Sequence, residues 1–367
     1  MKEEASVKKI FNITDFGAVG DGKTDCTAAI QAALDAARDA GGGVVEVPPG
    51  AYLTGQLRMK GQCITLKGYA GWGYHSDGNS AFILNDPSAE CILDITGAFD
   101  CFIDGMGFNG NRLGENIHGI RLDWDKHYRP QRNREDTPTI TNTRVAGCTG
   151  DGLHFNNVWA YKVNHSMFIF NKGAGIRYMG CDAFVSDCIM NGNQRGGVDG
   201  TALWSSGATF TANRIEWNGL GGIRLRRNTS LNITGNYLDR NFGPGVDLGG
   251  TEEDAGYADV TITGNAFIRN GAISEGRTAP RENPDLCCHL RMRQCRNVVV
   301  SGNTMKTGRN DYGDGEDTPT CAFILQDCSY CIIKDNAMDR GYIKTAIDLR
   351  GDCSTCLIKD NIGRPME

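Results

Sequence analysis

The chain has 367 residues, with 49 Gly, 10 Pro and a formal net charge of −6 at pH 7. This length is too great for one ordinary globular core unless the fold grows in one dimension. The negative charge argues against nucleic acid or an anionic membrane as partner, and we expect neither.

The N-terminal segment MKEEASVKKIFNITDFG lacks the apolar stretch of a signal peptide. No run of about 18 apolar residues follows it, so we expect no membrane span. These features predict a cytoplasmic protein, or a secreted one if a leader has been removed.

Residues 24–42, TDCTAAIQAALDAARDAGG, predict an amphipathic helix that two glycines end. Thr24 or Asp25 can cap its start. One face of this helix is apolar and consists of Ala29, Ile30, Ala33, Leu34 and Ala37. A strand-like segment then begins a repeating region, so residues 11–60 are interpreted as an N-terminal cap and a first coil.

Short segments with alternating apolar and polar residues recur from residue 118 onward, mostly every 20 to 33 residues. Each predicts a strand, and a fixed repeat of one supersecondary unit predicts a solenoid. The segments begin at His118, Asp151, Ala174, Thr201, Gly221, Pro244, Cys288, Cys321 and Thr345. We expect a single domain over 1–367, with regular coils over 118–361 and excursions at 123–145, 249–287 and 306–320.

One asparagine ends the turn of many repeats, often after a glycine. Coils of a solenoid stack about 4.8 Å apart, so neighbouring Asn amides can bond to one another. These asparagines are therefore predicted to be structural, satisfying buried turn backbone along the stack. They are Asn213, Asn236, Asn265, Asn303, Asn336 and Asn361.

Fifteen cysteines are present, several at matching repeat positions. Disulfides would suit a secreted protein. The CxxC pairs Cys328/Cys331 and Cys353/Cys356 match zinc spacing. Because both pairs occur at the same point of consecutive repeats, where small apolar residues stack, we favour buried reduced thiols.

Residues 11–53, FNITDFGAVGDGKTDCTAAIQAALDAARDAGGGVVEVPPGAYL, resemble the N-terminal segment of the pectate-lyase-3, glycoside-hydrolase-28-related group. The resemblance implies an all-β right-handed parallel β-helix with an N-terminal capping helix. It also implies action on, or binding of, a polysaccharide. Beyond these residues only the repeat pattern matches the group.

Side chains alternate inward and outward along each strand of such a coil. The inward positions are Ile120, Leu122, Leu153, Phe155, Ile176, Tyr178, Ile223, Leu225, Val246, Leu248, Leu290, Met292, Ile347 and Leu349. The outward positions form a face that suits a sugar chain, with substrate-binding candidates Arg121, Arg177, Trp204, Arg224 and Asp247. The alternative is a solvated, salt-bridged face.

Two carboxylates, Asp151 and Asp199, precede predicted strands and are candidate catalytic residues. If they lie two coils apart, about 9–10 Å separates them. This is near the upper end of the range for inverting glycosidases. His154 could adjust the protonation of Asp151, and Arg177 would hold substrate between the two acids. Alternatively, each Asp caps its own turn.

A polar excursion over residues 122–136 follows one of these strands. Asp123 is a further catalytic candidate there, and His127 a substrate-binding one. Asp125 and Glu135 are alternative acids. The basic residues Lys126, Arg129, Arg132 and Arg134 would favour an anionic sugar. We expect no metal and no cofactor, because no defined ligand spacing is present.

The G-H-G and R-I-K motifs of polygalacturonases are absent, as is the Asp-Pro-His-Glu motif of mannuronan epimerases. A glycoside hydrolase using two Asp is the leading interpretation. A polysaccharide lyase, an epimerase and an inulin-fructotransferase-like enzyme are alternatives. A non-catalytic, tailspike-like glycan-binding protein is an interpretation of another class, and a homotrimer is a candidate assembly.

Overall fold

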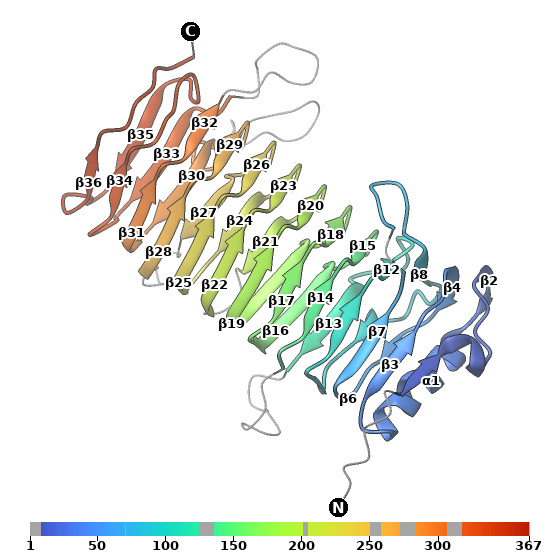
Figure 1. Cartoon of the computed structure of the whole chain (residues 1–367). Helices are drawn as coiled ribbons and strands as arrows, with labels where there is room; N and C mark the ends of the chain where they lie inside the picture. The colour runs from blue at the N-terminus through green and yellow to red at the C-terminus, as the bar shows by residue number, and fades with distance from the viewer. Residues whose placement is uncertain are drawn as a thin grey trace, which may run out of the picture. The chain divides into compact units, whose positions relative to one another are not determined.

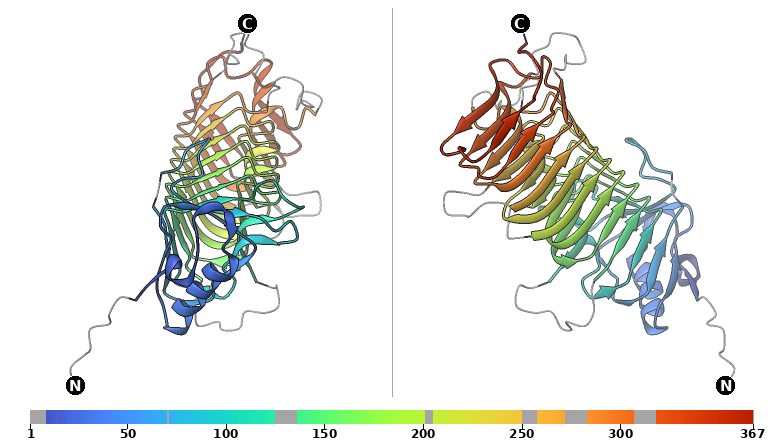
Figure 2. Two further views of the ribbon diagram at one scale, coloured as in Figure 1. Left: turned by 90° about the vertical axis from the view of Figure 1, so that its right-hand side faces the viewer. Right: turned by 60° about the vertical axis from the view of Figure 1, so that its left-hand side comes forward.

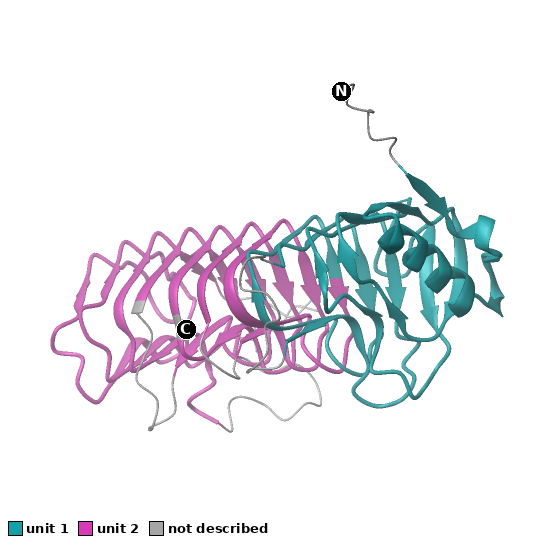
Figure 3. Cartoon of the chain, turned by 90° about the horizontal axis from the view of Figure 1, so that it is seen from below, with its two compact units in different colours: residues 1–167 teal, residues 168–367 magenta. Residues whose placement is uncertain are grey.

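The computed structural model describes residues 9–69, 71–124, 136–200, 205–249, 258–271, 283–306 and 318–366. The chain divides into two compact units, Met1–Met167 and Phe168–Glu367, and each is described by itself (Figure 3). A single domain over 1–367 stays a prediction. Among the described residues, no helix is long and apolar enough to span a membrane.

Near its N-terminal end, unit 1 contains the short 3-10 helix η1 (Ile13–Phe16) and the helix α1 (Thr27–Asp39), which lies against the first coils of the unit (Figure 2). The buried face of α1 contains Ile30, Ala33, Leu34 and Ala37, as predicted, whereas Ala29 is half-buried. The helix is shorter than the predicted 24–42. Near its start, Asp25 Oδ1 accepts a hydrogen bond from the Thr27 N–H at 2.9 Å.

The strands of unit 1 pair in parallel with strands one coil away, which defines a β-helix (Figure 1). One sheet holds β1 (Ile10–Asn12), β3 (Gly43–Glu46), β5 (Leu57–Arg58), β7 (Ile64–Lys67), β9 (Cys91–Asp94), β11 (Phe102–Asp104), β13 (His118–Asp123), β14 (Thr139–Thr141), β16 (Leu153–Trp159) and β17 (Lys162–Asn164). A second holds β2 (Asp21–Asp25), β4 (Gly50–Thr54), β8 (Ser80–Leu84), β12 (Gly107–Asn109) and β15 (Arg144–Ala146), and β6 (Gly61–Gln62) pairs with β10 (Ala98–Phe99).

The sequence analysis predicted that regular coils start at residue 118, but in the structure they start well before it. The strands between residues 43 and 117 are short, and few of them carry the Asn signature that marks later coils. The excursion predicted at 123–145 is also too long. Strand β14 pairs with β11 and β17, and β15 pairs with β12, so residues 139–141 and 144–146 belong to the coils of unit 1.

Unit 2 repeats the same parallel pairing. Its first sheet contains β19 (Ile176–Ser186), β21 (Gly196–Gly200), β22 (Ser205–Thr211), β24 (Gly221–Leu225), β25 (Asn228–Thr234), β27 (Val246–Gly249), β28 (Ala258–Thr263), β30 (Cys288–Arg293), β31 (Arg296–Ser301), β33 (Cys321–Gln326), β34 (Ile332–Lys334), β35 (Thr345–Arg350) and β36 (Leu357–Lys359). Its second sheet contains β20 (Ile189–Asn191), β23 (Arg214–Glu216), β26 (Tyr237–Asp239), β29 (Ala266–Ile268) and β32 (Thr304–Lys306); β18 (Met167–Ile169) begins at the last residue of unit 1. Strands β28 and β29 thus lie inside the excursion predicted at 249–287.

The inward positions predicted from the alternation are buried in all but the last of the described coils. In β35, Ile347 is only half-buried and Leu349 is 52% exposed. The alternation is correct there too, but among the described residues no further coil packs against these two side chains. Burial along a solenoid depends on the neighbouring coil as well as on the pattern of one strand.

The predicted asparagine ladder is present in unit 2. Asn213 Nδ2 donates to Asn236 Oδ1 at 2.9 Å, and the same bond recurs at 2.9–3.0 Å through Asn265, Asn303, Asn336 and Asn361. Each Oδ1 also accepts the backbone N–H of the preceding Asn. The amides therefore satisfy buried backbone at the turns, which is the structural role expected of them.

A second ladder, which the sequence analysis missed, joins Asn171, Asn193, Asn218, Asn241 and Asn270 by amide bonds of 2.8–2.9 Å. Its signal is an Asn five residues after members of the first ladder, as in NRIEWN and NYLDRN. Where the two ladders overlap, from Asn213 to Asn270, they fix two turns of each coil.

The fifteen cysteines are free thiols in the structure, and eleven of them are buried. Burial raises the pKa of Cys101 and Cys148 to about 12. The Cys328 thiol lies 3.6 Å from the Met292 carbonyl and 3.4 Å from the Gln326 carbonyl, which are its hydrogen-bond acceptors. Buried thiols therefore occupy the first CxxC position, as expected, whereas Cys353 and Cys356 of the second are only half-buried.

His289 gives a testable pH dependence. It is fully buried in unit 2, and its Nε2 bonds the Gly341 carbonyl at 3.0 Å. Burial lowers its pKa to about 3, whereas in the unfolded chain it titrates near 6.5. Below pH 6.5 His289 is therefore protonated in the unfolded state but stays neutral in the folded state. The free energy of unfolding falls as the pH drops toward about 3. Between pH 7 and pH 5 we expect this residue to remove about 2 kcal/mol of the unfolding free energy.

The measurement is denaturant unfolding of wild type and His289→Leu at pH 7 and pH 5. The variant should lose about 2 kcal/mol less stability over that interval than wild type. Equal losses in the two proteins would contradict a buried neutral His289.

Candidate functional site

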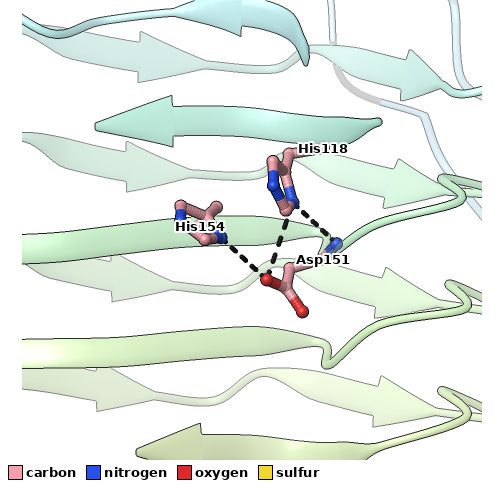
Figure 4. Close-up of side chains that lie close together, drawn as sticks. All are labelled: His118, Asp151 and His154. Atoms are coloured by element: carbon pink, nitrogen blue, oxygen red, sulfur yellow. Dashed lines mark hydrogen bonds and ion pairs between the residues drawn. The ribbon is translucent and has the colours of Figure 1, made fainter. Parts of the chain in front are cut away.

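Two neighbouring coils of unit 1 bring together His118, Asp151 and His154 (Figure 4). His118 is the first residue of β13, His154 lies in β16, and Asp151 stands two residues before β16. The two strands are parallel and in register, with Arg121 opposite His154. The register places the start of one coil beside the start of the next.

His154 is oriented by Asp151. Its Nδ1 lies 2.8 Å from Asp151 Oδ2, and a carboxylate can only accept, so the imidazole donates from Nδ1. The lone pair of a neutral His154 is then on Nε2, which points away from Asp151 in Figure 4. An imidazole held in one tautomer by a carboxylate is the usual arrangement of a general base.

His118 carries the opposite tautomer. The backbone N–H of Asp151 donates to His118 Nδ1 at 2.9 Å, so this nitrogen is an acceptor and the proton of a neutral ring is on Nε2. The same Nδ1 is 3.5 Å from Asp151 Oδ2. We assign the backbone bond, because a peptide N–H is an obligatory donor. The 3.5 Å approach is then not an ion pair.

The two imidazole rings stack with centroids 4.0 Å apart and an interplanar angle of 34°. His118 and Asp151 are buried, and the side chain of His154 is 14% exposed. Both Nε2 atoms are directed to the same side in Figure 4. The cluster thus pairs one nitrogen that can take a proton with one that can give a proton.

The cluster offers one nitrogen from each ring and one carboxylate oxygen within 4.8 Å of one another, and among the described residues it is the one such group that could hold a metal ion. However, the backbone N–H of Asp151 already occupies His118 Nδ1. The same nitrogen cannot serve both that donor and a cation, so His118 could bind a cation only through Nε2.

Arg121 and Asp123 lie beside the cluster, on the outward side of β13. Arg121 contacts Glu90 at 2.6 Å and Asp123 at 3.1 Å, and Asn156 donates to Asp123 at 2.5 Å. Burial would raise the pKa of Asp123, but the hydrogen bonds from Asn156 and Arg121, and the charge of Arg121, bring it below its usual value. Asp123 is thus a poor proton donor and serves to hold Arg121.

Asp199 is placed differently from the prediction. It was expected just before a strand that starts at Thr201, but it lies within β21, in register between Arg177 and Arg224. Its Oδ2 accepts from Arg195 Nε and Arg224 Nη1, both at 3.2 Å. A buried carboxylate between two guanidinium groups is arranged for ion pairing rather than for proton donation.

The other predicted binding residues of unit 2 continue this row. Asp247 is in register with Arg224 and with Arg291, and it forms a bidentate pair with Arg291 at 2.8 and 2.7 Å. The sequence analysis did not identify Arg291 as the partner of Asp247. Asp199 and Asp247 therefore both form ion pairs with arginines of the same row.

Trp204 and His127 lie outside the described residues, as do the alternatives Asp125 and Glu135. The predicted separation of Asp151 and Asp199 joins the two units and stays a prediction. His118 and Asn156 were missed by the sequence analysis. Both could have been found by aligning the segments HGIRLD and DGLHFN one coil apart.

Comparison with known proteins yields two family models. One, described as rhamnogalacturonase A/epimerase, pectate lyase-like, matches residues 10–247. Another, described as the right-handed beta helix region, matches residues 205–363. The predicted right-handed parallel β-helix and the predicted resemblance to pectate-lyase-like proteins are both confirmed.

Curated relatives are carbohydrate-active enzymes by name. Mannuronan C5-epimerase AlgE2 of Azotobacter vinelandii is 25% identical over 283 residues, covering 71% of this chain and 25% of that protein. Alginate lyase 7 of the same organism is 67% identical over 109 residues, covering 29% and 11%. Exo-poly-alpha-D-galacturonosidase of Dickeya chrysanthemi is 25% identical over 334 residues, covering 75% and 53%.

The chain thus spans about a quarter of the length of the curated epimerases. Among solved structures, the A-module of Azotobacter vinelandii mannuronan C-5 epimerase AlgE4 has a TM-score of 0.70 at 18% identity. That match covers 98% of this chain and all of the module. At such identity the likeness concerns the fold.

Proposed function

Because the chain belongs to the rhamnogalacturonase A/epimerase, pectate lyase-like family, we propose that it is a carbohydrate-active enzyme acting on an acidic polysaccharide. In this proposal it removes the proton from the carbon next to a uronate carboxyl group. The names of the epimerase and lyase relatives support the substrate class. The orientation of His154 by Asp151 is the observation that carries the reaction type.

In the proposed first step, His154 Nε2 takes the proton and the C–H electron pair passes into the carboxyl group. Asp151 stabilises the imidazolium that forms, since it already accepts from Nδ1. Arg121, the register neighbour of His154, contributes positive charge where the carboxyl group becomes more negative.

Two outcomes share this step. If the glycosidic C–O bond then breaks, a carbon–carbon double bond forms, the leaving oxygen takes a proton, and the enzyme is a lyase. If a proton returns to the opposite face of the carbon, the enzyme is an epimerase. His118, with its proton on Nε2, is the second group of the cluster that can carry a proton.

The test is incubation of wild type with polymannuronate, alginate and polygalacturonate, with products followed by mass and ultraviolet absorbance. A lyase gives unsaturated, ultraviolet-absorbing ends, and an epimerase gives polymer of unchanged length with altered stereochemistry. Both activities should vanish in His154→Gln. Binding without any turnover of these polymers would instead favour the tailspike-like, non-catalytic interpretation.

Glycoside hydrolysis is the second candidate, because the galacturonosidase relative aligns over 75% of the chain. It would use Asp151 and Asp199 as acid and base, as the sequence suggested. Products that gain water, formed by wild type but not by Asp151→Asn or Asp199→Asn, would support it. We rank it second because each of these carboxylates is occupied by cationic or N–H donors.

A further inference from the structure

The outward row of unit 2 alternates in charge from coil to coil. The register runs Arg177, Asp199, Arg224, Asp247, Arg291 across five neighbouring strands. Asp199 is shared by Arg195 and Arg224, and Asp247 is held by Arg291. The carboxylates of the row are thus fully used.

Two outward arginines of unit 2, Arg177 at the start of this row and Arg293 two residues after Arg291 in β30, are left without a direct partner. Neither Arg177 nor Arg293 makes a hydrogen bond or ion pair within the described part of unit 2, and the Nε of each is buried without a partner. Both side chains are half-buried. Burying a charged donor without a partner is unfavourable, so a site that keeps two of them points to an absent anion.

Arg293 is held in place by its surroundings. A Cβ on Gly249, its register neighbour, would lie 3.0 Å from Arg293 Cβ and 3.1 Å from Arg293 Nε. Glycine at 249 therefore leaves the space in which the Arg293 stem lies. Burial and the positive charges of Arg291 and Arg226 lower the pKa of Arg293, whereas the carboxylates of Asp247 and Asp285 act in the opposite direction.

We propose that unit 2 carries a binding site of its own for the carboxylates of an acidic polysaccharide, with Arg177 and Arg293 as its two anchors. Four coil steps separate the anchors, about 19 Å at the spacing of stacked strands. This span suits a chain that offers carboxylates on several successive sugars. The inference rests on the proposed function for the identity of the sugar, but not for the existence of the site.

The experiment is equilibrium binding of polymannuronate and polygalacturonate to the whole chain, with a neutral mannan as control. Arg293→Met and Arg177→Met should each weaken binding about tenfold, as expected for loss of one charge-assisted bond. The double variant should lose about the product of the two, since the sites are far apart. Arg296→Ala removes an exposed arginine that stacks on Tyr330, and it should bind like wild type.

Gly249→Ala keeps every charge but crowds Arg293, so it should also weaken binding. A purely structural role predicts the opposite pattern: Arg293→Met would lower stability and leave binding intact. If the arginine instead binds an anion, Arg293→Met should be as stable as wild type or more stable, because an unpaired buried charge is removed.

Equal binding by wild type, Arg293→Met and Arg177→Met, or no binding of either polyuronate by wild type, would overturn the proposal. Turnover without arginine-dependent binding would remove this inference and leave the proposed function. Arginine-dependent binding without turnover would support this binding site and contradict the proposed function.

Discussion

Replacing His154 with glutamine should reduce turnover of an acidic polysaccharide by about 10³-fold or more. General base catalysis by a positioned side chain contributes about 10²–10⁴-fold, and glutamine cannot take a proton at neutral pH. Folding should be little affected, since His154 makes one side-chain bond, worth about 1 kcal/mol. The measurement is initial rate at saturating substrate, with unfolding followed in parallel.

Asp151→Asn tests the orientation rather than the base itself. An amide can donate to His154 Nδ1, which would favour the tautomer with the proton on the reacting Nε2. We therefore expect a loss of about 10²-fold or more in turnover, with binding retained. His165→Gln is the matched control, because His165 is an exposed histidine of unit 1 away from the cluster. Full activity in His154→Gln would exclude this residue as the base.

Asn265→Ala should cause the largest loss of stability among single changes considered for unit 2. The Asn265 amide accepts the backbone N–H of Asn236 and donates to the Ile233 carbonyl, at 2.9 Å each. Alanine leaves both groups buried without a partner. At about 1–3 kcal/mol for each such group, the expected loss is about 2–6 kcal/mol in the free energy of unfolding.

Asn361→Ala is the matched control at the end of the same ladder. Asn361 is only half-buried, so water can replace part of what its amide provides. We expect a loss of about 1 kcal/mol or less there. Denaturant unfolding of both variants gives the comparison. Equal losses at the two positions would mean that the ladder does not act through burial of backbone groups.

The fold could be predicted from sequence because the same types of side chain recur at matching positions of successive coils. Asn213 and its successors recur once per coil, and the inward residues such as Ile223 and Leu225 keep period two. The N-terminal coils were missed because their strands are short and few repeat that asparagine. The pattern of one strand also cannot tell that Leu349 lacks a covering coil in the described chain.

The site was predicted in part, and its errors have a physical cause. Strand β21 reads GGVDG, and its glycines hide it from a search for apolar alternation. Gly200 is required because a Cβ there would lie 2.7 Å from Leu225 Cδ2 and 3.1 Å from the Tyr178 carbonyl. The strand was therefore predicted to start at residue 201, and Asp199 was not recognised as a member of the outward row between Arg177 and Arg224. His118 was missed because Asp151, its partner, lies on the next coil, and only the register between the two coils brings the two residues together.

The most direct test of the account is solvent hydrogen exchange. Polymannuronate is incubated with wild type or His154→Gln in deuterium oxide, and the sugars are read by mass. Proton removal by His154 predicts either deuterium at the carbon next to the carboxyl group or unsaturated ends that have not gained water, with wild type alone. Products that have gained water, with no deuterium on carbon, would contradict the account and favour the two-aspartate hydrolase.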